Sequence, residues 1–368
     1  MKLTQELHDL GQSLWLDNIT RTLLSDGTLR RYITDYSVTG LTSNPTIFDK
    51  AIKEGGFYDA TIRQRKAEAE SAEAVFFELA LADLVDAADL FRSVYDSSGG
   101  VDGWVSLEVS PLLANDTAAS IDAALELHRR AQRPNLFVKI PGTPAGVPAI
   151  EESIFRGVPI NVTLLFSPEQ YRAAAEAYVR GITRRITAGL APDVASVASL
   201  FVSRWDVAVQ DRVSPQLRNR LGIAIARRTY KAYRELLASP GWKQLEAAGA
   251  RPQRLLWAST GTKDPDAPDT LYVEALAAPD TINTMPDKTL LAFADHGELN
   301  GVMPVDGGDA EETLGKFARL GIDDATLAAE LQREGTESFV KSWRDLMDRI
   351  ASKIELPGEA DRTPAEHA

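Results

Sequence analysis

The chain has 368 residues, of which 44% are hydrophobic and 25% charged, as is typical of a globular protein with a large core. Its 53 acidic and 40 basic residues give a net charge of -13, which argues against nucleic acid or an anionic membrane as a partner. The lack of cysteine excludes disulfides, thiolate catalysis and thiolate metal sites.

The start of the chain lacks the apolar core of a signal peptide. The most apolar helical stretch, 74–91, carries several acidic side chains, so it does not predict a membrane span. We therefore expect a cytoplasmic protein, and the lack of cysteine is compatible with a reducing cytosol.

Short apolar runs typical of strands alternate with helical patterns along the chain. In order, we expect a helix over 3–13, a strand at 14–17, a helix over 25–34 with Asp26 as its cap, a strand at 36–45, a helix over 46–53 and one or two helices within 58–97. A strand at 104–111, a helix over 117–131, a strand at 136–140, a helix over 145–156, a strand at 160–167 and a helix over 168–187 follow. The remainder predicts a strand at 194–202, a helical section over 214–247, strands at 255–261 and 281–286, and a largely helical segment over 309–355.

Strands that alternate with helices, without Asn-Gly hairpins, favour a parallel sheet with crossover helices. Eight such units predict an α/β fold of the (β/α)8 TIM barrel type, with helical insertions and a helical C-terminal extension. An open doubly wound sheet is the competing architecture, but no Gly-x-Gly-x-x-Gly follows any predicted strand. We expect one catalytic domain over 1–355 and a flexible polar tail over 356–368.

Lys139 lies within the apolar run 136–140, and Pro141 and Gly142 end that predicted strand directly afterwards. An ammonium on a buried strand is costly unless it is paired or loses its proton. In a parallel barrel the carboxyl ends of the strands form the catalytic face. Lys139 is therefore a candidate Schiff-base nucleophile. The alternative is a lysine that makes a structural ion pair at the strand end.

Other polar residues near the predicted strand ends would meet at the same mouth of a barrel. In such a set a neutral lysine attacks a ketone, and nearby carboxylates transfer protons. Hydroxyl and amide groups would hold sugar hydroxyls or a water, and cations would take a terminal phosphate. The set consists of Asp17, Asn44, Glu108, Lys139, Thr163, Ser199, Arg204, Ser259 and Lys263.

Each of these residues also has a structural interpretation. Asp17 could cap the turn that follows it, and Asn44 could bond only its own backbone. Glu108 and Lys139 could simply neutralise one another. The threonine and the serines are ordinary strand residues, and the remaining cations could be surface groups. The four histidines lack ligand spacing, so we expect no metal site.

Six motifs, each weak alone, together resemble the transaldolase family. They occur in the family's order within about 14–290, at 40–46, 105–109, 137–143, 160–167, 199–204 and 257–260. The longer bacterial branch is the most similar, because the chain carries Ser-Thr-Gly-Thr-Lys at 259–263 and Asn-Thr-Met-Pro at 283–286.

This resemblance implies a (β/α)8 barrel without a metal or an organic cofactor. It implies transfer of a dihydroxyacetone unit from sedoheptulose 7-phosphate to glyceraldehyde 3-phosphate, giving erythrose 4-phosphate and fructose 6-phosphate in the pentose phosphate pathway. Lys139 then matches the Schiff-base lysine, and Asp17 matches the acid/base that acts on the C4 hydroxyl. Glu108 and Thr163 match the pair that holds the water of imine formation and release.

Asn44 and Ser199 match residues that orient the dihydroxyacetone part, and Arg204 matches a phosphate-binding arginine. Shorter members of the family carry a second arginine just after the serine of the seventh strand, where this chain has glycine and threonine. We infer that Ser259 and Lys263 bind the phosphate instead, with the lysine as a point charge.

Two other functions remain open at this stage. A fructose-6-phosphate aldolase would share the barrel and the lysine but release free dihydroxyacetone. A non-catalytic sugar-phosphate-binding barrel would bind without turnover, since a fold does not by itself fix a function. The sequence is compatible with a monomer or a homodimer.

Overall fold

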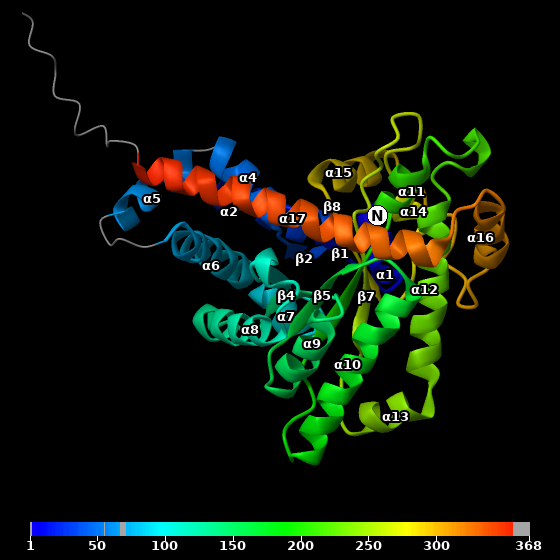
Figure 1. The fold of residues 1–368 in the computed structure, drawn as a ribbon, viewed down its shortest axis with the longest axis horizontal. Helices are drawn as coiled ribbons and strands as arrows, with labels where there is room; N and C mark the ends of the chain where they lie inside the picture. Colours follow the sequence, from blue (N-terminus) through cyan, green and yellow to red (C-terminus); the bar gives the residue numbers. More distant parts are fainter. Residues whose placement is uncertain (1, 55, 67–70, 356–368) are drawn as a thin grey trace, which may run out of the picture.

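A computed structural model describes residues 2–54, 56–66 and 71–355, so the expected flexible tail lies outside the described residues. Eight parallel strands close into a barrel in chain order, which confirms the predicted (β/α)8 fold (Figure 1). The strands are β1 (Gln12–Leu16), β2 (Val38–Thr42), β3 (Trp104–Glu108), β4 (Leu136–Pro141), β5 (Ile160–Leu165), β6 (Ser196–Phe201), β7 (Arg254–Ala258) and β8 (Thr281–Met285). β1 pairs with β8, which closes the ring.

Helices surround the barrel and extend beyond it. Those that precede or connect the strands are α1 (Leu3–Asp9), α2 (Arg21–Ser25), α3 (Thr28–Tyr36), α4 (Pro45–Glu54), α5 (Asp59–Lys66), α6 (Ala72–Leu90), α7 (Arg92–Ser97), α8 (Thr117–Ala131), α9 (Gly146–Phe155), α10 (Pro168–Thr187), α11 (Ser203–Val209), α12 (Leu221–Ala238), α13 (Pro240–Ala247) and α14 (Leu271–Ala275). After β8 come α15 (Asp287–His296), α16 (Ala310–Arg319) and α17 (Asp324–Glu355). In the part of the chain that the structure describes, no helix is long and apolar enough to span a membrane.

Several predicted helix boundaries were wrong because local backbone signals override the apolar pattern. The first helix ends at Asp9 rather than at 13, since Gly11 has φ +94° and β1 begins directly after it. The section 214–247 divides into α12 and α13, because Ser239 is extended and its hydroxyl caps the new helix at the Trp242 amide.

The N-terminal half of the chain also holds more helices than the pattern indicated. The described residues of segment 58–97, which exclude 67–70, form three helices instead of one or two. The helix predicted over 25–34 begins at Thr28, and α2 precedes it. Asp26 still assists its start, because its Oδ1 accepts a hydrogen bond from the Thr28 amide at 2.8 Å.

Aromatic side chains fill the barrel below the mouth. Phe137 stacks on Trp104 with ring centroids 4.0 Å apart and lies 6.2 Å from the Trp15 ring. Gly40 is required here, because a Cβ at that position would lie 2.7 Å from the Trp15 ring. Phe137 is two residues before Lys139 on β4, so both side chains face the barrel interior. The lysine therefore lies directly above a group of buried aromatic rings.

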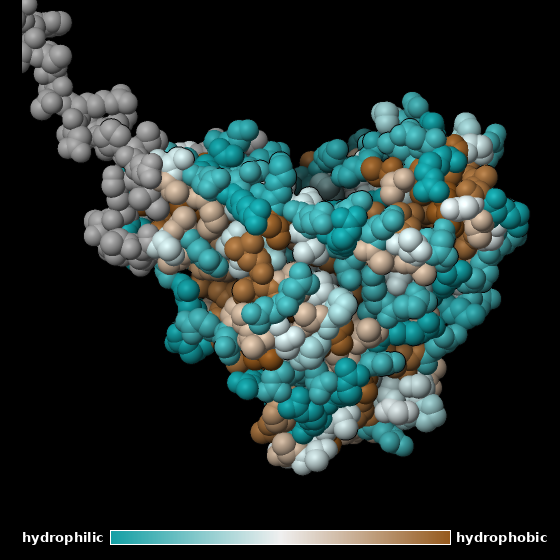
Figure 2. All heavy atoms as spheres, viewed as in Figure 1, coloured by the Kyte–Doolittle hydropathy of each residue, from teal (hydrophilic) through white to brown (hydrophobic). Residues whose placement is uncertain are grey.

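The long helix α17 runs across the molecule from the side of α16 to α4 and α5 (Figure 1). It packs against α4, α5 and α6, which follow β2 in the chain. Gln332 of α17 donates hydrogen bonds to the carbonyls of Gly142, at 2.9 Å, and Leu164, at 3.0 Å. These carbonyls lie at the carboxyl ends of β4 and β5, so the C-terminal helix crosses the mouth of the barrel. Hydrophilic residues cover most of the face seen in Figure 2, with hydrophobic residues in small groups between them.

Candidate active site

Lys139 and Glu108 are register partners on neighbouring strands β4 and β3. Their side chains are 7% and 3% exposed, and Nζ lies 3.2 Å from Oε2. The Lys139 ammonium donates a hydrogen bond to the Ser43 carbonyl at 2.9 Å. Neither carboxyl oxygen of Glu108 accepts a hydrogen bond from any described residue. The two groups therefore form a buried ion pair that leaves the carboxylate free to accept hydrogen bonds.

Asp17 follows β1 directly, and its amide donates to the Met285 carbonyl of β8 at 2.8 Å. Its carboxyl accepts a hydrogen bond from the Thr42 hydroxyl at 3.0 Å, and Thr42 lies 2.8 Å from Thr284. Among the described residues this carboxyl accepts no helix-capping bond, so the turn-capping interpretation was wrong.

Burial is the main influence on both carboxylates. It raises the pKa of the Asp17 carboxyl, although the charge of Lys139 and the Thr42 hydroxyl oppose the shift. Burial also raises the pKa of Glu108, again against the attraction of Lys139. Loss of hydration in the barrel interior disfavours the ionised carboxylates, and the single ammonium of Lys139 beside both of them does not offset this effect. Both groups are therefore stronger bases than exposed carboxylates.

β5 and β6 contribute polar side chains beside this pair. Thr163 of β5 is fully buried, and its hydroxyl has no hydrogen-bond partner in the described residues. Ser199 of β6 donates to Asn161 at 2.7 Å, and Asn161 donates to the Ser106 hydroxyl at 3.1 Å. Asn161 is the register partner of Lys139, so this chain of hydrogen bonds lies beside the lysine. Thr163 is thus free to bind a water or a substrate, whereas Ser199 is already oriented.

Asn44 has the local role that its sequence position suggested as an alternative. Its Oδ1 accepts a hydrogen bond from the Ile47 amide at 3.0 Å, which caps the first turn of α4. The residue also lines the cavity above Lys139. Its side-chain amide nitrogen donates no hydrogen bond to the described residues, so it can donate to a ligand.

The cations lie on the side of β6 and β7. The Arg204 guanidinium lies 5.2 Å from the Phe201 ring centroid and 5.8 Å from that of Phe339. The Lys263 charge lowers the pKa of Asp17, opposing the effect of burial there. Ser259 has φ +56°, and its hydroxyl lies 2.9 Å from the hydroxyl of Ser203. None of the described carboxylates forms an ion pair with Arg204 or Lys263, so both cations can take an anionic ligand.

Eight of the nine predicted residues line one cavity of about 280 Å³ at the carboxyl ends of the strands. The exception is Glu108, which does not line the cavity but lies 3.2 Å from the nitrogen of Lys139, which does. The tertiary structure therefore brings together residues that are up to 246 positions apart, from Asp17 to Lys263. Among the described residues, no three His, Asp or Glu side chains converge as metal ligands.

Sequence reasoning missed several residues of this cavity. Thr42 and Thr284 stand at strand ends, so their position carried a signal, but a threonine in a strand is usually structural. Lys50, on α4, has no signal beyond its charge. Phe339 belongs to α17, and nothing in the sequence pattern connects that helix with the mouth.

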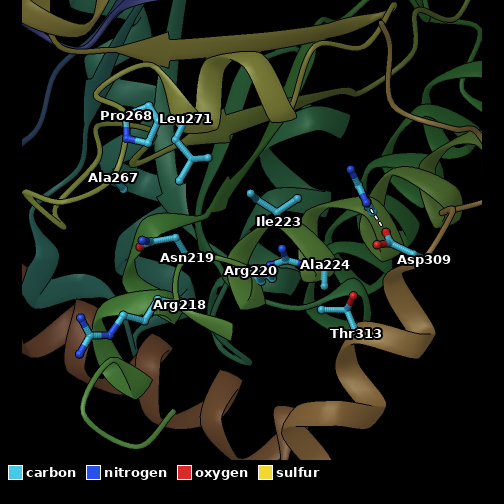
Figure 3. Close-up of a pocket in the computed structure, with 11 residues that line it drawn as sticks. Arg218, Asn219, Arg220, Ile223, Ala224, Ala267, Pro268, Leu271, Asp309 and Thr313 are labelled. Atoms are coloured by element: carbon cyan, nitrogen blue, oxygen red, sulfur yellow. Dashed lines mark hydrogen bonds and ion pairs between the residues drawn. The ribbon is translucent and has the colours of Figure 1, made fainter. Parts of the chain in front are cut away.

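A second cavity, of about 410 Å³, lies between α12, α14 and α16 (Figure 3). Ile223 and Leu271 supply apolar lining, and the dashed line at Asp309 in Figure 3 is its ion pair with Arg227. It contains none of the nine predicted residues. Because it lacks an amine beside a buried carboxylate, it is not the candidate active site.

Comparison with known proteins gives an independent line of evidence. A family model described as "Transaldolase/Fructose-6-phosphate aldolase" matches residues 14–350. A protein named "Transaldolase" from Saccharopolyspora erythraea is 44% identical over 360 residues, covering 95% of this chain and 97% of that protein. Proteins of the same name from Thermobifida fusca and Thiobacillus denitrificans are also 44% identical over 95% of this chain, and cover 98% and 100% of their own lengths.

Proposed function

Because this chain belongs to the transaldolase/fructose-6-phosphate aldolase family, we propose that it is a transaldolase that acts through a Schiff base on Lys139. It transfers a dihydroxyacetone unit from sedoheptulose 7-phosphate to glyceraldehyde 3-phosphate, and so belongs to the pentose phosphate pathway. The observation that carries the proposal is the buried amine of Lys139 beside the Glu108 carboxylate, 3.2 Å away, at the catalytic end of a parallel barrel.

The first step forms the imine. The Lys139 ammonium gives a proton to Glu108, and the neutral amine adds to the ketose carbonyl carbon to form a carbinolamine. The carbinolamine hydroxyl takes the proton back from Glu108 and leaves as water, which produces an iminium ion. Glu108 and Thr163 hold that water, because among the described residues no group donates a hydrogen bond to the carboxylate and none pairs with the threonine hydroxyl. Burial raises the pKa of Glu108, which makes its carboxylate a better proton acceptor than an exposed one.

The second step breaks the carbon–carbon bond. Asp17 takes the proton of the C4 hydroxyl, the C3–C4 bond breaks, and its electron pair moves into the iminium to give an enamine. The aldose leaves, and the enamine then attacks the aldehyde carbon of the acceptor while Asp17 returns its proton. Burial raises the pKa of Asp17, which makes this carboxylate a better base than an exposed one. Hydrolysis of the new imine frees Lys139.

Substrate orientation is divided between the two sides of the cavity. Asn44 and Ser199 hold the dihydroxyacetone part near Lys139, with Ser199 already fixed by its bond to Asn161. Arg204 and Lys263 bind the phosphate, since neither has a carboxylate partner in the described part of the chain, and the Ser259 hydroxyl assists them.

Borohydride reduction tests the central claim. Incubation with fructose 6-phosphate and borohydride should leave a permanent adduct on Lys139, located by peptide mass spectrometry. Lys139→Ala should lose the adduct and turnover together. Lys243→Ala is the matched control, because this exposed lysine pairs with Glu246 and lies outside the cavity. An adduct on another lysine, or none, would refute the mechanism.

The competing activity within the same family is aldol cleavage that releases dihydroxyacetone. Supplying fructose 6-phosphate with and without an aldehyde acceptor distinguishes the two. A transaldolase forms the new ketose when the acceptor is present, whereas an aldolase releases dihydroxyacetone without one. Binding without either reaction would favour a non-catalytic barrel.

We further propose that residues 1–355 form one catalytic domain that works in the cytoplasm. The domain assignment is supported by α17, because this C-terminal helix lines the same cavity as Asp17 near the start of the chain. The cellular assignment is supported by the absence of cysteine. Monomer and homodimer remain the two expected states, and sedimentation of the purified protein distinguishes them.

A further inference from the structure

The C-terminal helix α17 forms one wall of the active-site cavity. Phe339, near its middle, lines the cavity. One turn later, Ser342 accepts a hydrogen bond from Thr46 of α4 at 2.9 Å. Gln332 binds carbonyls beside β4 and β5 on the other side of the mouth. The stretch 332–342 is therefore fixed at both ends, and the side chains between these points lie against the mouth.

Arg204 lies between this wall and the barrel, and no charged side chain of the residues that the structure describes pairs with it. Its guanidinium contacts the ring faces of Phe201 and Phe339, and none of the described carboxylates is within ion-pair distance of it. Burial lowers the pKa of Arg204, and the more distant charge of Glu334 opposes that shift. Aromatic rings can orient a guanidinium but leave its N–H groups unused. The position of Arg204 thus depends on packing rather than on an ion pair.

Gly335 provides the space that this packing needs. A Cβ on Gly335 would lie 3.2 Å from Nη1 of Arg204 and 3.0 Å from Cδ2 of Leu164. Both neighbours are ends of flexible side chains, so an added methyl group would displace them without moving the backbone. Glycine is also a poor choice inside a helix of 32 residues. The helix therefore carries an unfavourable residue at the point where the guanidinium approaches it.

We propose that Gly335 and Phe339 are positioning residues for Arg204, and that α17 thereby sets the preference of the enzyme for phosphorylated ketoses. The inference rests on the proposed function, in which Arg204 binds the substrate phosphate. Gly335 lets the guanidinium lie close to the helix, and Phe339 holds its plane. Bidentate binding of a phosphate depends on that orientation, whereas imine chemistry at Lys139 does not.

The test compares a phosphorylated and an unphosphorylated ligand in Gly335→Ala. We expect KM for fructose 6-phosphate to rise roughly tenfold, as for the loss of one charge-assisted hydrogen bond. The rate of borohydride trapping with dihydroxyacetone should stay at the wild-type value, because this ligand has no phosphate. Phe339→Leu should raise the same KM roughly threefold, as for the loss of a cation–π contact. It serves as the second variant if Gly335→Ala does not fold.

Two further variants make the test specific. Gly315→Ala in α16 is the matched control, because beyond its chain neighbours and its own helix backbone an added Cβ would meet only Arg319, at 3.9 Å, within the described part of the chain. Its KM should not change. Gly335→Ala should add nothing when Arg204 is already replaced by alanine, since both changes remove the same contact.

Three results would overturn the inference: an unchanged KM in both Gly335→Ala and Phe339→Leu, an additive effect in the double variant, or an equal loss of dihydroxyacetone trapping. Failure of the proposed function is a different result, in which wild-type protein gives no adduct on Lys139 with either ligand.

Discussion

Gln332 connects the C-terminal helix to the strands that carry the reactive lysine and threonine. Its amide donates to the Gly142 carbonyl at 2.9 Å and to the Leu164 carbonyl at 3.0 Å. Leu164 has φ +59°, an unfavourable conformation for leucine, at the point where the β5–β6 register shifts. Gly142 in turn donates its amide to the Thr163 carbonyl at 2.7 Å. Gln332 therefore stabilises the unusual backbone that follows Thr163.

We predict that Gln332→Met destabilises the protein and slows turnover. Methionine has a similar length and helix propensity but cannot donate, so both carbonyls lose their donor. At about 1 kcal/mol for each hydrogen bond, the free energy of unfolding falls by about 2 kcal/mol. An unfolding entropy of about 2.1 cal/mol/K per residue over about 350 residues converts this into a decrease in Tm of about 3 °C. Turnover should fall because Leu164 can relax and shift Thr163.

Differential scanning calorimetry and a coupled turnover assay measure the two effects. Gln244→Met in α13 is the control, since Gln244 is exposed and has no assigned side-chain hydrogen bond in the described chain; its Tm and kcat should match the wild type. If Gln332→Met keeps the wild-type Tm, the carbonyls find other donors and the stability reasoning is wrong. If Tm falls but kcat does not, Gln332 stabilises the fold without positioning Thr163.

The remaining predictions concern titratable groups. Asp17→Asn should lower kcat by roughly 10²–10⁴-fold while adduct formation on the lysine continues, and lost trapping would assign the residue to the imine step. Because burial raises the pKa of Asp17, acidification should reduce wild-type turnover at a higher pH than it would for an ordinary carboxylate. In the variant only the loss caused by protonation of Glu108, whose pKa burial also raises, should remain. Lys263→Ala should raise KM for phosphorylated substrates with kcat little changed, and an unchanged KM would make this lysine a surface group. Burial raises the pKa of Asp206 to about 6. The unfolded-state value is lower, about 3.9, so proton binding stabilises the folded state fully below that value, and the contribution is lost as pH rises through 6. Relative to Asp206→Asn, the wild type should lose about 0.8 kcal/mol of unfolding free energy between about pH 5.5 and about pH 7.5, measured by urea denaturation; a constant difference would contradict the shift.

The sequence predicted the fold and eight of the eighteen residues that line the cavity, because each parallel strand is marked by its own apolar run and by the residues that end it. An apolar run such as 136–140, closed by Pro-Gly, indicates both a buried strand and its carboxyl end. Closure of the barrel brings eight such ends to one mouth. The sequence could therefore predict that Lys139, Thr163 and Ser199 lie at the same cavity. Helix boundaries were less certain, as at Ser239, because one capping residue decides them.

Other features of the site had no local signal. Asn44 caps α4 and also lines the cavity, and the sequence offered no means to tell whether it would do one or both. Asp17 bonds to Thr42 rather than to its own turn, a contact between two strands that spacing cannot reveal. The bond of Asp17 depends on which group from another part of the chain lies nearby, whereas the cap made by Asn44 is local.

The sequence by itself determined the alternation of strands and helices, and with it the set of polar groups at the strand ends. The spacing of hydrophobic residues and the proline and glycine residues that end an element are both local properties of the chain. Only the tertiary structure decided that Lys139 pairs with Glu108 above buried aromatic rings, and that α17 lies across the mouth of the barrel beside Arg204. Burial and charge pairing arise from contacts between distant segments. The chemistry of an amine or a carboxylate depends on those contacts, since the same side chain is acidic or basic according to the water and the charges around it.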